Sequence, residues 1–308
     1  MYALTATTGK IGGAVLNAIL KYQLLSPSSL VICTSSDTTL PLWESLKSQG
    51  AQVRTFKHED PSTMVVALQG CTKLFLVSTP DISMDYFDAP PGKGREASHF
   101  AALKAAKEAG VGHVFYTSLA FASGSGAGVM RAHFRTEEFL KGCGMKYTVM
   151  REGLYNESWP LYLGFYYGLK NEERGEVVIA GDGPISWTSI RDLGIATALV
   201  VSEASEKYVG KTFFLSGTET KTLKQIAEMV SSARGIEVRT KVVSVEEYCR
   251  YYIEGKGLDK GNVEWWSTTY PALQQKECWI KDPTFSELLA SKGVKPIPVE
   301  ETIKEMLS

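Results

Sequence analysis

Small residues stand at a regular spacing near the start of the chain, in the stretch MYALTATTGKIGGAV. Ala6, Gly9 and Gly12 are spaced as in a phosphate-binding loop, between an apolar strand at 2–4 and an amphipathic helix that opens near Gly12. The first N–H groups of a helix have no intrahelical partner and carry partial positive charge, so they bind anions. The spacing predicts a diphosphate site whose approach glycine keeps free of side chains, with an ordinary strand-to-helix turn as the alternative. Alanine at the first position fits only if its φ is negative.

Apolar strands alternate with helical segments along the first half of the chain. The expected strands are residues 2–4, 29–34, 52–56, 73–78, 113–118 and 145–151. Asp60 and Pro61 have the types of an N-cap and a first helical residue, and residues 95–109 have helical spacing. This alternation is typical of an α/β Rossmann-type fold, a doubly wound parallel sheet that binds ligands beyond the carboxyl ends of its strands.

The chain changes character after residue 152. Residues 153–170 are dense in aromatic side chains, which predicts either the lining of an apolar pocket or the packing of a second domain. Further strands and helices follow without a flexible linker. We therefore expect a Rossmann domain over 1–152 and a smaller α/β substrate domain over 153–308 that interleaves with it, with 186–205 returning to the first.

Composition narrows the classes of partner. The net charge of −1 over 308 residues, with basic residues dispersed, disfavours nucleic acid and anionic membranes. No apolar run reaches the roughly 18–20 residues of a membrane span. The five cysteines lie far apart, which predicts no metal site, no disulfide framework and a reducing compartment. A strand from residue 2 leaves no room for a signal peptide, so we expect a cytoplasmic protein. We also expect a monomer or a homodimer.

Several blocks of sequence together resemble a known family. They are LTATTGKIG at 4–12, YTSL at 116–119, HFRTEEFL at 133–140, YTVMREGLYNES at 147–158 and AGDGPISWTSIRDL at 180–193. Their order and spacing resemble the NmrA-like atypical short-chain dehydrogenases, especially the NAD(P)H:quinone oxidoreductase type 2 and triphenylmethane reductase subgroup. The resemblance implies a cofactor in the cleft between a Rossmann domain and a substrate domain. The family also contains members that bind NADP and regulate without turnover.

The resemblance and the strand ends together assign a set of cofactor contacts. The glycine loop falls on Thr5, Thr8, Gly9, Lys10, Ile11 and Gly12. Residues that end adjacent strands, where Rossmann cofactors lie, are Ser78, Thr79, Pro80 and Ser118. The resemblance places Tyr155 and Asn156 over the nicotinamide. The expected substrate pocket consists of Phe87, Phe121, Glu152 and Trp159.

The choice between NADPH and NADH depends on the end of the second strand. Relatives that prefer NADPH often have arginine there, whereas this chain has Ser35, Ser36 and Asp37. Hydroxyl groups hold a phosphate without the charge of a guanidinium, and Asp37 repels it. No acidic residue ends the strand itself, as an NAD-specific site requires, and Lys10 offers a compensating charge. We expect NADP as the cofactor, with NAD as the alternative.

The usual catalytic Tyr-x-x-x-Lys pair is missing. Aligned through Glu137, the tyrosine position is Val129 and the lysine position is His133. His133 is the candidate acid or cofactor ligand, because imidazole titrates near neutrality. The alternative is that it pairs with Glu137 one helical turn away. Tyr155 is the second catalytic candidate. Glu152 stands where relatives have asparagine, so it would act as an acid or base if it faces the cleft.

These features favour hydride transfer from NAD(P)H to a conjugated small molecule such as a quinone, an enone or an imine. The cofactor carries the chemistry, and an apolar aromatic pocket suits a flat acceptor. One alternative is a non-catalytic NADP-binding sensor, which would need an exposed apolar patch; Trp265 and Trp266 are the sequence's candidates for it, or else core residues. The other alternative is non-redox chemistry of the isomerase type on the same fold.

Overall fold

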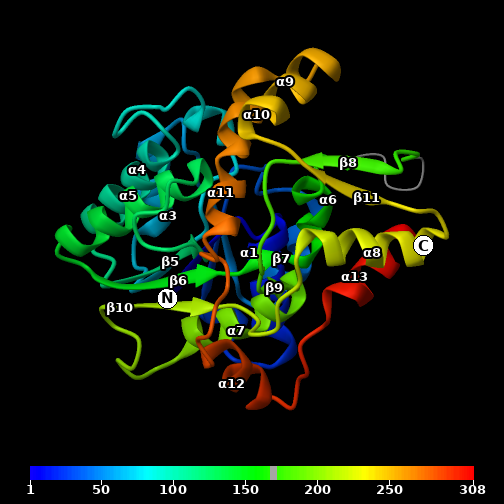
Figure 1. The fold of residues 1–308 in the computed structure, drawn as a ribbon. Helices are drawn as coiled ribbons and strands as arrows, with labels where there is room; N and C mark the ends of the chain where they lie inside the picture. The colour runs from blue at the N-terminus through cyan, green and yellow to red at the C-terminus, as the bar shows by residue number, and fades with distance from the viewer. Residues whose placement is uncertain (167–171) are drawn as a thin grey trace.

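A parallel sheet forms the centre of the molecule (Figure 1). The structure, a computed structural model, describes residues 1–166 and 172–308. The sheet has seven strands in the order β10-β6-β5-β4-β1-β2-β3. They are β1 (Tyr2–Thr5), β2 (Leu30–Thr34), β3 (Gln52–Thr55), β4 (Lys73–Leu76), β5 (His113–Leu119), β6 (Lys146–Glu152) and β10 (Lys211–Leu215). The reversal of strand order between β1 and β4 is that of a Rossmann sheet, which confirms the predicted fold class.

Helices cover both faces of the sheet, so its central strands, such as β2, β4 and β5, are buried on both sides. One layer consists of α1 (Lys10–Lys21), α7 (Ile190–Ser202) and α12 (Thr284–Ala290), with the short α2 (Glu44–Ser48) at its edge. The other consists of α3 (Pro61–Leu68), α4 (Glu96–Glu108) and α5 (Gly128–Gly142). Successive strand residues point to opposite layers: Val149 packs with α3–α5 and Met150 with α1 and α7. The same alternation sets the direction of each polar side chain at the strand ends.

The later half of the chain returns to this sheet. Segment 186–205 contributes α7, which crosses α1 closely: a Cβ on Gly194 would lie 2.5 Å from Cβ of Ala14. Beyond that segment, β10 pairs in parallel with β6, and α12 packs on α7. The chain thus leaves the sheet after β6 and comes back twice, first with α7 and β10 and then with α12.

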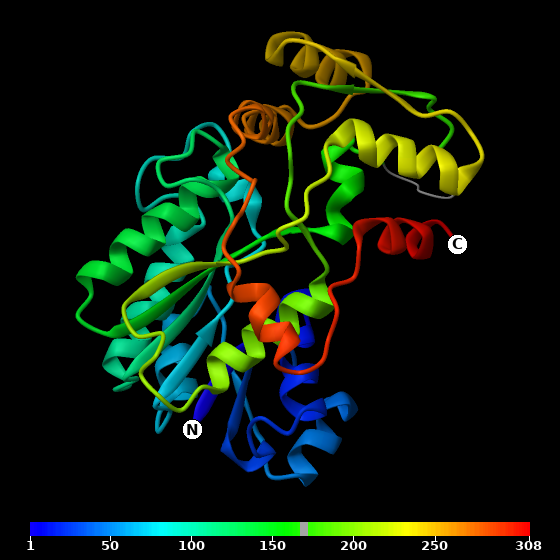
Figure 2. The same cartoon turned by 60° about the horizontal axis from the view of Figure 1, so that its bottom comes forward.

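The remaining elements gather beyond the carboxyl ends of the strands (Figure 2). They are β7 (Leu154–Tyr155), α6 (Trp159–Tyr162), β8 (Glu176–Ile179), β9 (Trp187–Thr188), α8 (Leu223–Arg234), β11 (Arg239–Val242), α9 (Val245–Arg250), a π-helical turn (Tyr251–Gly255), α10 (Lys260–Ser267), α11 (Thr269–Gln274) and α13 (Val299–Leu307). Short 3₁₀ turns occupy Pro27–Ser29, Pro41–Trp43, Ile82–Asp85 and Asn156–Ser158. In the described residues no helix is long and apolar enough to cross a membrane.

Aromatic side chains build the core of this second part. Within 153–166, the rings of Trp159, Tyr162, Phe165 and Tyr166 are buried together, so the packing interpretation holds for them. The rest of the predicted aromatic segment, 167–170, lies outside the described residues. Trp265 and Trp266 join the same core and are 8% and 4% exposed. The paired tryptophans are therefore core residues and form no exposed patch.

Candidate functional site

The N-terminus of α1 is open to an anion. Gly9 is its N-cap, no side chain caps the helix, and its first turn has no acidic residue. Thr8, Gly9 and Lys10 are exposed, and a groove of about 600 Å³ begins beside the last two and runs between α1 and α7. Free N–H groups and the helix dipole both favour a phosphate here. The loop therefore fits the diphosphate that its sequence predicted.

Gly12 and Ala6 shape this loop differently from the sequence expectation. Ala6 has φ +53°, not a negative φ, and this left-handed conformation costs a residue with a Cβ about 1–2 kcal/mol. A Cβ on Gly12 would lie 2.3 Å from the carbonyl oxygen of Ala6 and 2.7 Å from that of Thr5. The glycine lets the helix pack directly on the loop's backbone. A side chain at Gly12 meets that backbone, so its role is packing rather than phosphate access.

The hydroxyl of Thr5 joins two strands. It donates to the carbonyl of Phe75 at 3.1 Å and accepts from the N–H of Val77 at 3.0 Å. Both of these partners belong to the chain around the end of β4. The side chain of Thr5 thus links β1 to β4.

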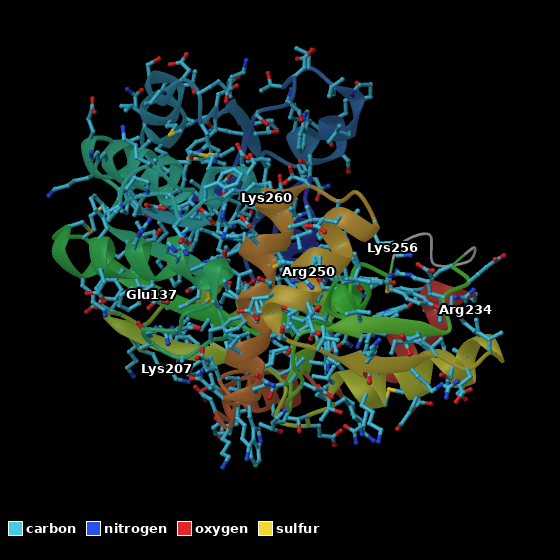
Figure 3. The ribbon with its side chains drawn as sticks, turned by 45° about the horizontal axis from the view of Figure 1, so that its top comes forward. Glu137, Lys207, Arg234, Arg250, Lys256 and Lys260 are labelled. Carbon is cyan, nitrogen blue, oxygen red and sulfur yellow. The ribbon has the colours of Figure 1, made fainter. Side chains whose placement is uncertain are left out.

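A buried carboxylate organises the ends of β5 and β6. Glu137 of α5 receives two hydrogen bonds from Arg151, at 3.0 and 2.6 Å, and one from the hydroxyl of Ser118 at 2.6 Å. Figure 3 shows Glu137 on the green helix, in the part of the molecule that carries the sheet. The pairing of Glu137 with His133 that the helical spacing allowed is absent. The hydroxyl of Ser118 is directed toward Glu137 of α5.

His133 of α5 is buried against Tyr116 of β5. Its Nδ1 is 3.2 Å from the phenolic oxygen of Tyr116, and its ring is 43° from that ring at a centroid separation of 6.1 Å. Burial, with the charge of Arg95, holds the pKa of His133 well below its usual value, while a hydrogen bond to the backbone of Thr117 opposes this. The imidazole is therefore neutral, and its neighbours are protein groups rather than the open end of the sheet.

Glu152 and Tyr155 form the most chemically capable pair of the site. Glu152 ends β6 with its side chain fully buried, and its Oε2 accepts the Tyr155 hydroxyl at 3.1 Å. Burial raises the pKa of Glu152 to about 8, against the hydrogen bond from Tyr155. Burial and the neighbouring carboxylate raise the pKa of Tyr155 well above its usual value. The pair can hold a proton at neutral pH.

The remaining residues predicted to contact cofactor or substrate differ in burial and in their partners. The amide of Asn156 donates to the carbonyl of Ile297 at 3.2 Å and to Oγ1 of Thr302 at 3.1 Å, and so connects the segment after β7 to α13 and the residues before it. Phe121 and Trp159 are fully buried in the aromatic core. Phe87 is 74% exposed.

A cation from α2 reaches the loop after β2, and the spacing did not reveal it. Ser35 is exposed and Ser36 half-buried, as a phosphate contact requires. Asp37 stays charged, because hydrogen bonds from Thr39 lower the pKa of its carboxyl. Lys47, ten residues further on, donates from Nζ to the carbonyl of Thr38 at 2.6 Å. The sequence did not indicate Lys47, because it lies on α2 and reaches this loop only in the folded chain. Among the described residues no cluster of His, Cys, Asp or Glu side chains is arranged to hold a metal ion.

The fold and the open helix N-terminus define a protein of the Rossmann class. The profile described as the NmrA-like family matches residues 3–262, and the chain belongs to this family. It is 30% identical to quinone oxidoreductase 2 of Escherichia coli over 85% of this chain and 84% of that protein. It is 28% identical to an NmrA-like family domain-containing oxidoreductase of Aspergillus flavus, over 99% and 94% of the two chains.

Solved structures agree over the whole length. The Escherichia coli NADPH-dependent quinone oxidoreductase in complex with NADPH superposes with a TM-score of 0.80 at 28% identity, covering 100% of both chains. A triphenylmethane reductase of Citrobacter sp. in complex with NADP(H) gives a TM-score of 0.79 at 25% identity, covering 99% of both chains. The resemblance stated from the sequence blocks is confirmed.

Proposed function

We propose that this protein is an NADPH-dependent reductase that transfers hydride to a conjugated small molecule, such as a quinone, an enone or an imine. One observation carries the proposal. The open N-terminus of α1 stands in a chain whose fold matches, from end to end, that of an NADPH-bound quinone oxidoreductase. NADH is the alternative cofactor.

Separate groups of residues would bind the different parts of the cofactor. The N–H groups of Lys10, Ile11 and Gly12 would bind its diphosphate, since the N–H of Gly9 already donates to the carbonyl of Ala6 at 2.9 Å. Ser35 with Lys47 would lie near its 2′-phosphate. When bound, the reduced nicotinamide supplies the hydride. We infer the division already expected, a cofactor domain over 1–152 with 186–205, and a substrate part over 153–308.

The proton that follows the hydride is assigned to Tyr155 and Glu152. With a pKa of about 8, Glu152 keeps its proton at neutral pH. As negative charge grows on the reduced substrate, the hydroxyl of Tyr155 would turn its proton from Oε2 of Glu152 to the substrate, and the protonated Glu152 would donate its own proton to Tyr155 across the same 3.1 Å separation. His133 has a neutral, enclosed ring and takes a supporting role behind β5 in this scheme.

A panel of acceptors tests the proposal. Purified protein is mixed with NADPH or NADH and a para-quinone, an azo dye or an imine, and the loss of cofactor absorbance is followed. Gly9→Asp places a carboxylate at the uncapped helix end and should abolish both binding and turnover. Gly142→Asp, the same substitution at an exposed position of α5 where an added Cβ meets nothing within 4 Å, should leave both intact. Tight NADPH binding without oxidation by any acceptor would favour a sensor instead.

We also infer a reducing, cytoplasmic setting and a monomer or homodimer. All five cysteines are free in the structure, and Cys33, Cys71 and Cys278 are buried. Light scattering of the purified chain distinguishes the two oligomeric states.

A further inference from the structure

The backbone that leaves β4 is held by side chains from three other elements. The successive N–H groups of segment 77–79 donate to Oγ1 of Thr5, to Oγ1 of Thr117 and to Nε2 of His99, each at 3.0 Å. These acceptors belong to β1, β5 and α4. Three consecutive backbone donors that all end on side chains give this segment one defined conformation.

Side chains accept these backbone hydrogen bonds because the strand pairing of β4 has ended. The β1–β4 ladder stops at Phe75, and the β4–β5 ladder stops at Leu76. The N–H groups beyond it have no strand partner, although Thr79 is only 8% exposed. A buried N–H without an acceptor is costly, so the acceptors also stabilise the segment.

His99 is a fixed acceptor. Thr136 donates its hydroxyl to the carbonyl of Ala132 at 2.7 Å, so its oxygen can only accept from Nδ1 of His99, 2.8 Å away. Nδ1 therefore carries the ring proton, and Nε2 has a free lone pair for the N–H of Thr79. Burial and the charge of Arg95 lower the pKa of His99 to about 3, so the ring is neutral.

Arg95 holds the carbonyl group of Thr79. Its Nη1 donates to the carbonyl of Thr79 at 3.1 Å, while its Nε is 2.7 Å from Oδ2 of Asp85. Both members of this ion pair are buried. Thr79 is thus held at its N–H and at its carbonyl, and Pro80 follows with a restricted φ.

We infer that Thr117 and His99, together with Thr5, are positioning residues that shape segment 77–79 into a platform for the cofactor before it binds. The inference depends on the proposed function. In the strand order β5-β4-β1, this segment lies between the glycine loop after β1 and the polar ends of β5 and β6. A dinucleotide that spans those ends crosses it. A segment already ordered loses little conformational entropy on binding, which strengthens binding without a direct contact.

Paired substitutions test the platform. Thr117→Val keeps the side-chain shape and removes the acceptor, whereas Thr117→Ser keeps the acceptor. His99→Leu and His99→Gln form a second such pair. Leu103→Ala is the control, since Leu103 is buried in α4 and makes no contact with the segment by hydrogen bonding. Affinity for NADPH and for adenosine 2′,5′-bisphosphate, which lacks the nicotinamide half, is measured by titration calorimetry.

The expected pattern is specific. Thr117→Val and His99→Leu weaken NADPH binding at least about tenfold and the bisphosphate less than about twofold, while Thr117→Ser and His99→Gln stay close to wild type. Amide hydrogen exchange of segment 77–79 accelerates in the same two weakened variants, a readout that needs no cofactor.

Three results would overturn the platform: unchanged NADPH affinity in Thr117→Val, equal loss in Thr117→Ser, or equal loss in Leu103→Ala. They are distinct from failure of the proposed function. In that case the wild-type protein itself would not bind NADPH, and the inference would fall with it.

Discussion

The phenolic oxygen of Tyr155 lies 3.1 Å from Oε2 of the fully buried Glu152, three residues before it in the chain. A carboxyl group at the end of β6 thus has a proton donor beside it and little access to water. Burial raises the pKa of this carboxyl group to about 8, so it keeps its proton at neutral pH. This relationship gives the first prediction.

Glu152→Gln keeps a hydrogen-bond acceptor for Tyr155 and removes the titration. The pKa of Glu152 is raised, so the folded state binds this proton more tightly than the unfolded state does. The stability it contributes is complete below about pH 4.5 and is lost as pH rises through about 8. Urea unfolding between these values should show a flatter pH dependence in the variant. Its turnover should fall by about tenfold or more and lose any inflection near pH 8.

If turnover in Glu152→Gln has the wild-type rate and pH profile, Glu152 takes no part in proton transfer. Tyr155→Phe separates the two roles, because it removes the donor while the carboxyl group remains.

Gly12→Ala should disturb the glycine loop itself. The added Cβ has no room beside the backbone of Ala6, so we expect a loss of about 1–3 kcal/mol in the free energy of unfolding together with weaker NADPH binding. Gly142→Ala is the matched control, since its Cβ would have no neighbour within 4 Å and it lies in a helix. Denaturant unfolding and calorimetry measure the two effects. Weaker binding at unchanged stability would restore the phosphate-access role.

Ala6→Gly should stabilise the protein. Glycine adopts the observed φ of +53° without strain, which offsets its greater freedom in the unfolded chain. The expected gain is at most about 1 kcal/mol. Ala18→Gly, in the interior of α1, should lose about 1 kcal/mol. A destabilised Ala6→Gly variant would contradict the left-handed assignment of Ala6.

His133→Ala distinguishes a supporting role from a catalytic one. Loss of the ring leaves the buried hydroxyl of Tyr116 without this partner, so stability should fall by about 1–3 kcal/mol. Turnover of the folded protein should stay within about threefold of wild type. The sequence prediction was the opposite, a turnover at least about tenfold lower with unchanged melting. Steady-state rates and thermal melting of the same preparation decide between them.

Ser35→Arg should shift the cofactor preference toward NADPH by about 1–2 kcal/mol, the range of a charge-assisted phosphate contact. The wild type should discriminate weakly, because Asp37 stays negative beside the exposed Ser35. Ser45→Arg on α2 is a control of equal charge. Calorimetry with both cofactors gives the ratio. A wild-type preference above roughly a thousandfold would mean that other residues recognise the phosphate.

The sequence by itself predicted most strands of the sheet and the glycine loop that leads into α1. Apolar runs such as 29–34 and the spacing of Gly9 and Gly12 are local signals, because a strand's burial and a helix's first turn depend on neighbouring residues. The strand predicted at 73–78 is two residues shorter in the structure, because the end of a strand depends on its partners and not only on its own residues. Val77 and Ser78 bond to side chains that lie far away in sequence.

Only the tertiary structure decided what the polar side chains do. Helical spacing offered Glu137 to His133, but the pairing of β5 with β6 brings Arg151 and Ser118 to that carboxylate. Glu152 was ambiguous until α7 returned to bury it, since burial depends on segments that fold back from later in the chain. Local pattern fixes which elements form. Contacts between elements fix which charges are neutralised, which protons are held and which loops are rigid, because those energies depend on distance in space rather than along the chain.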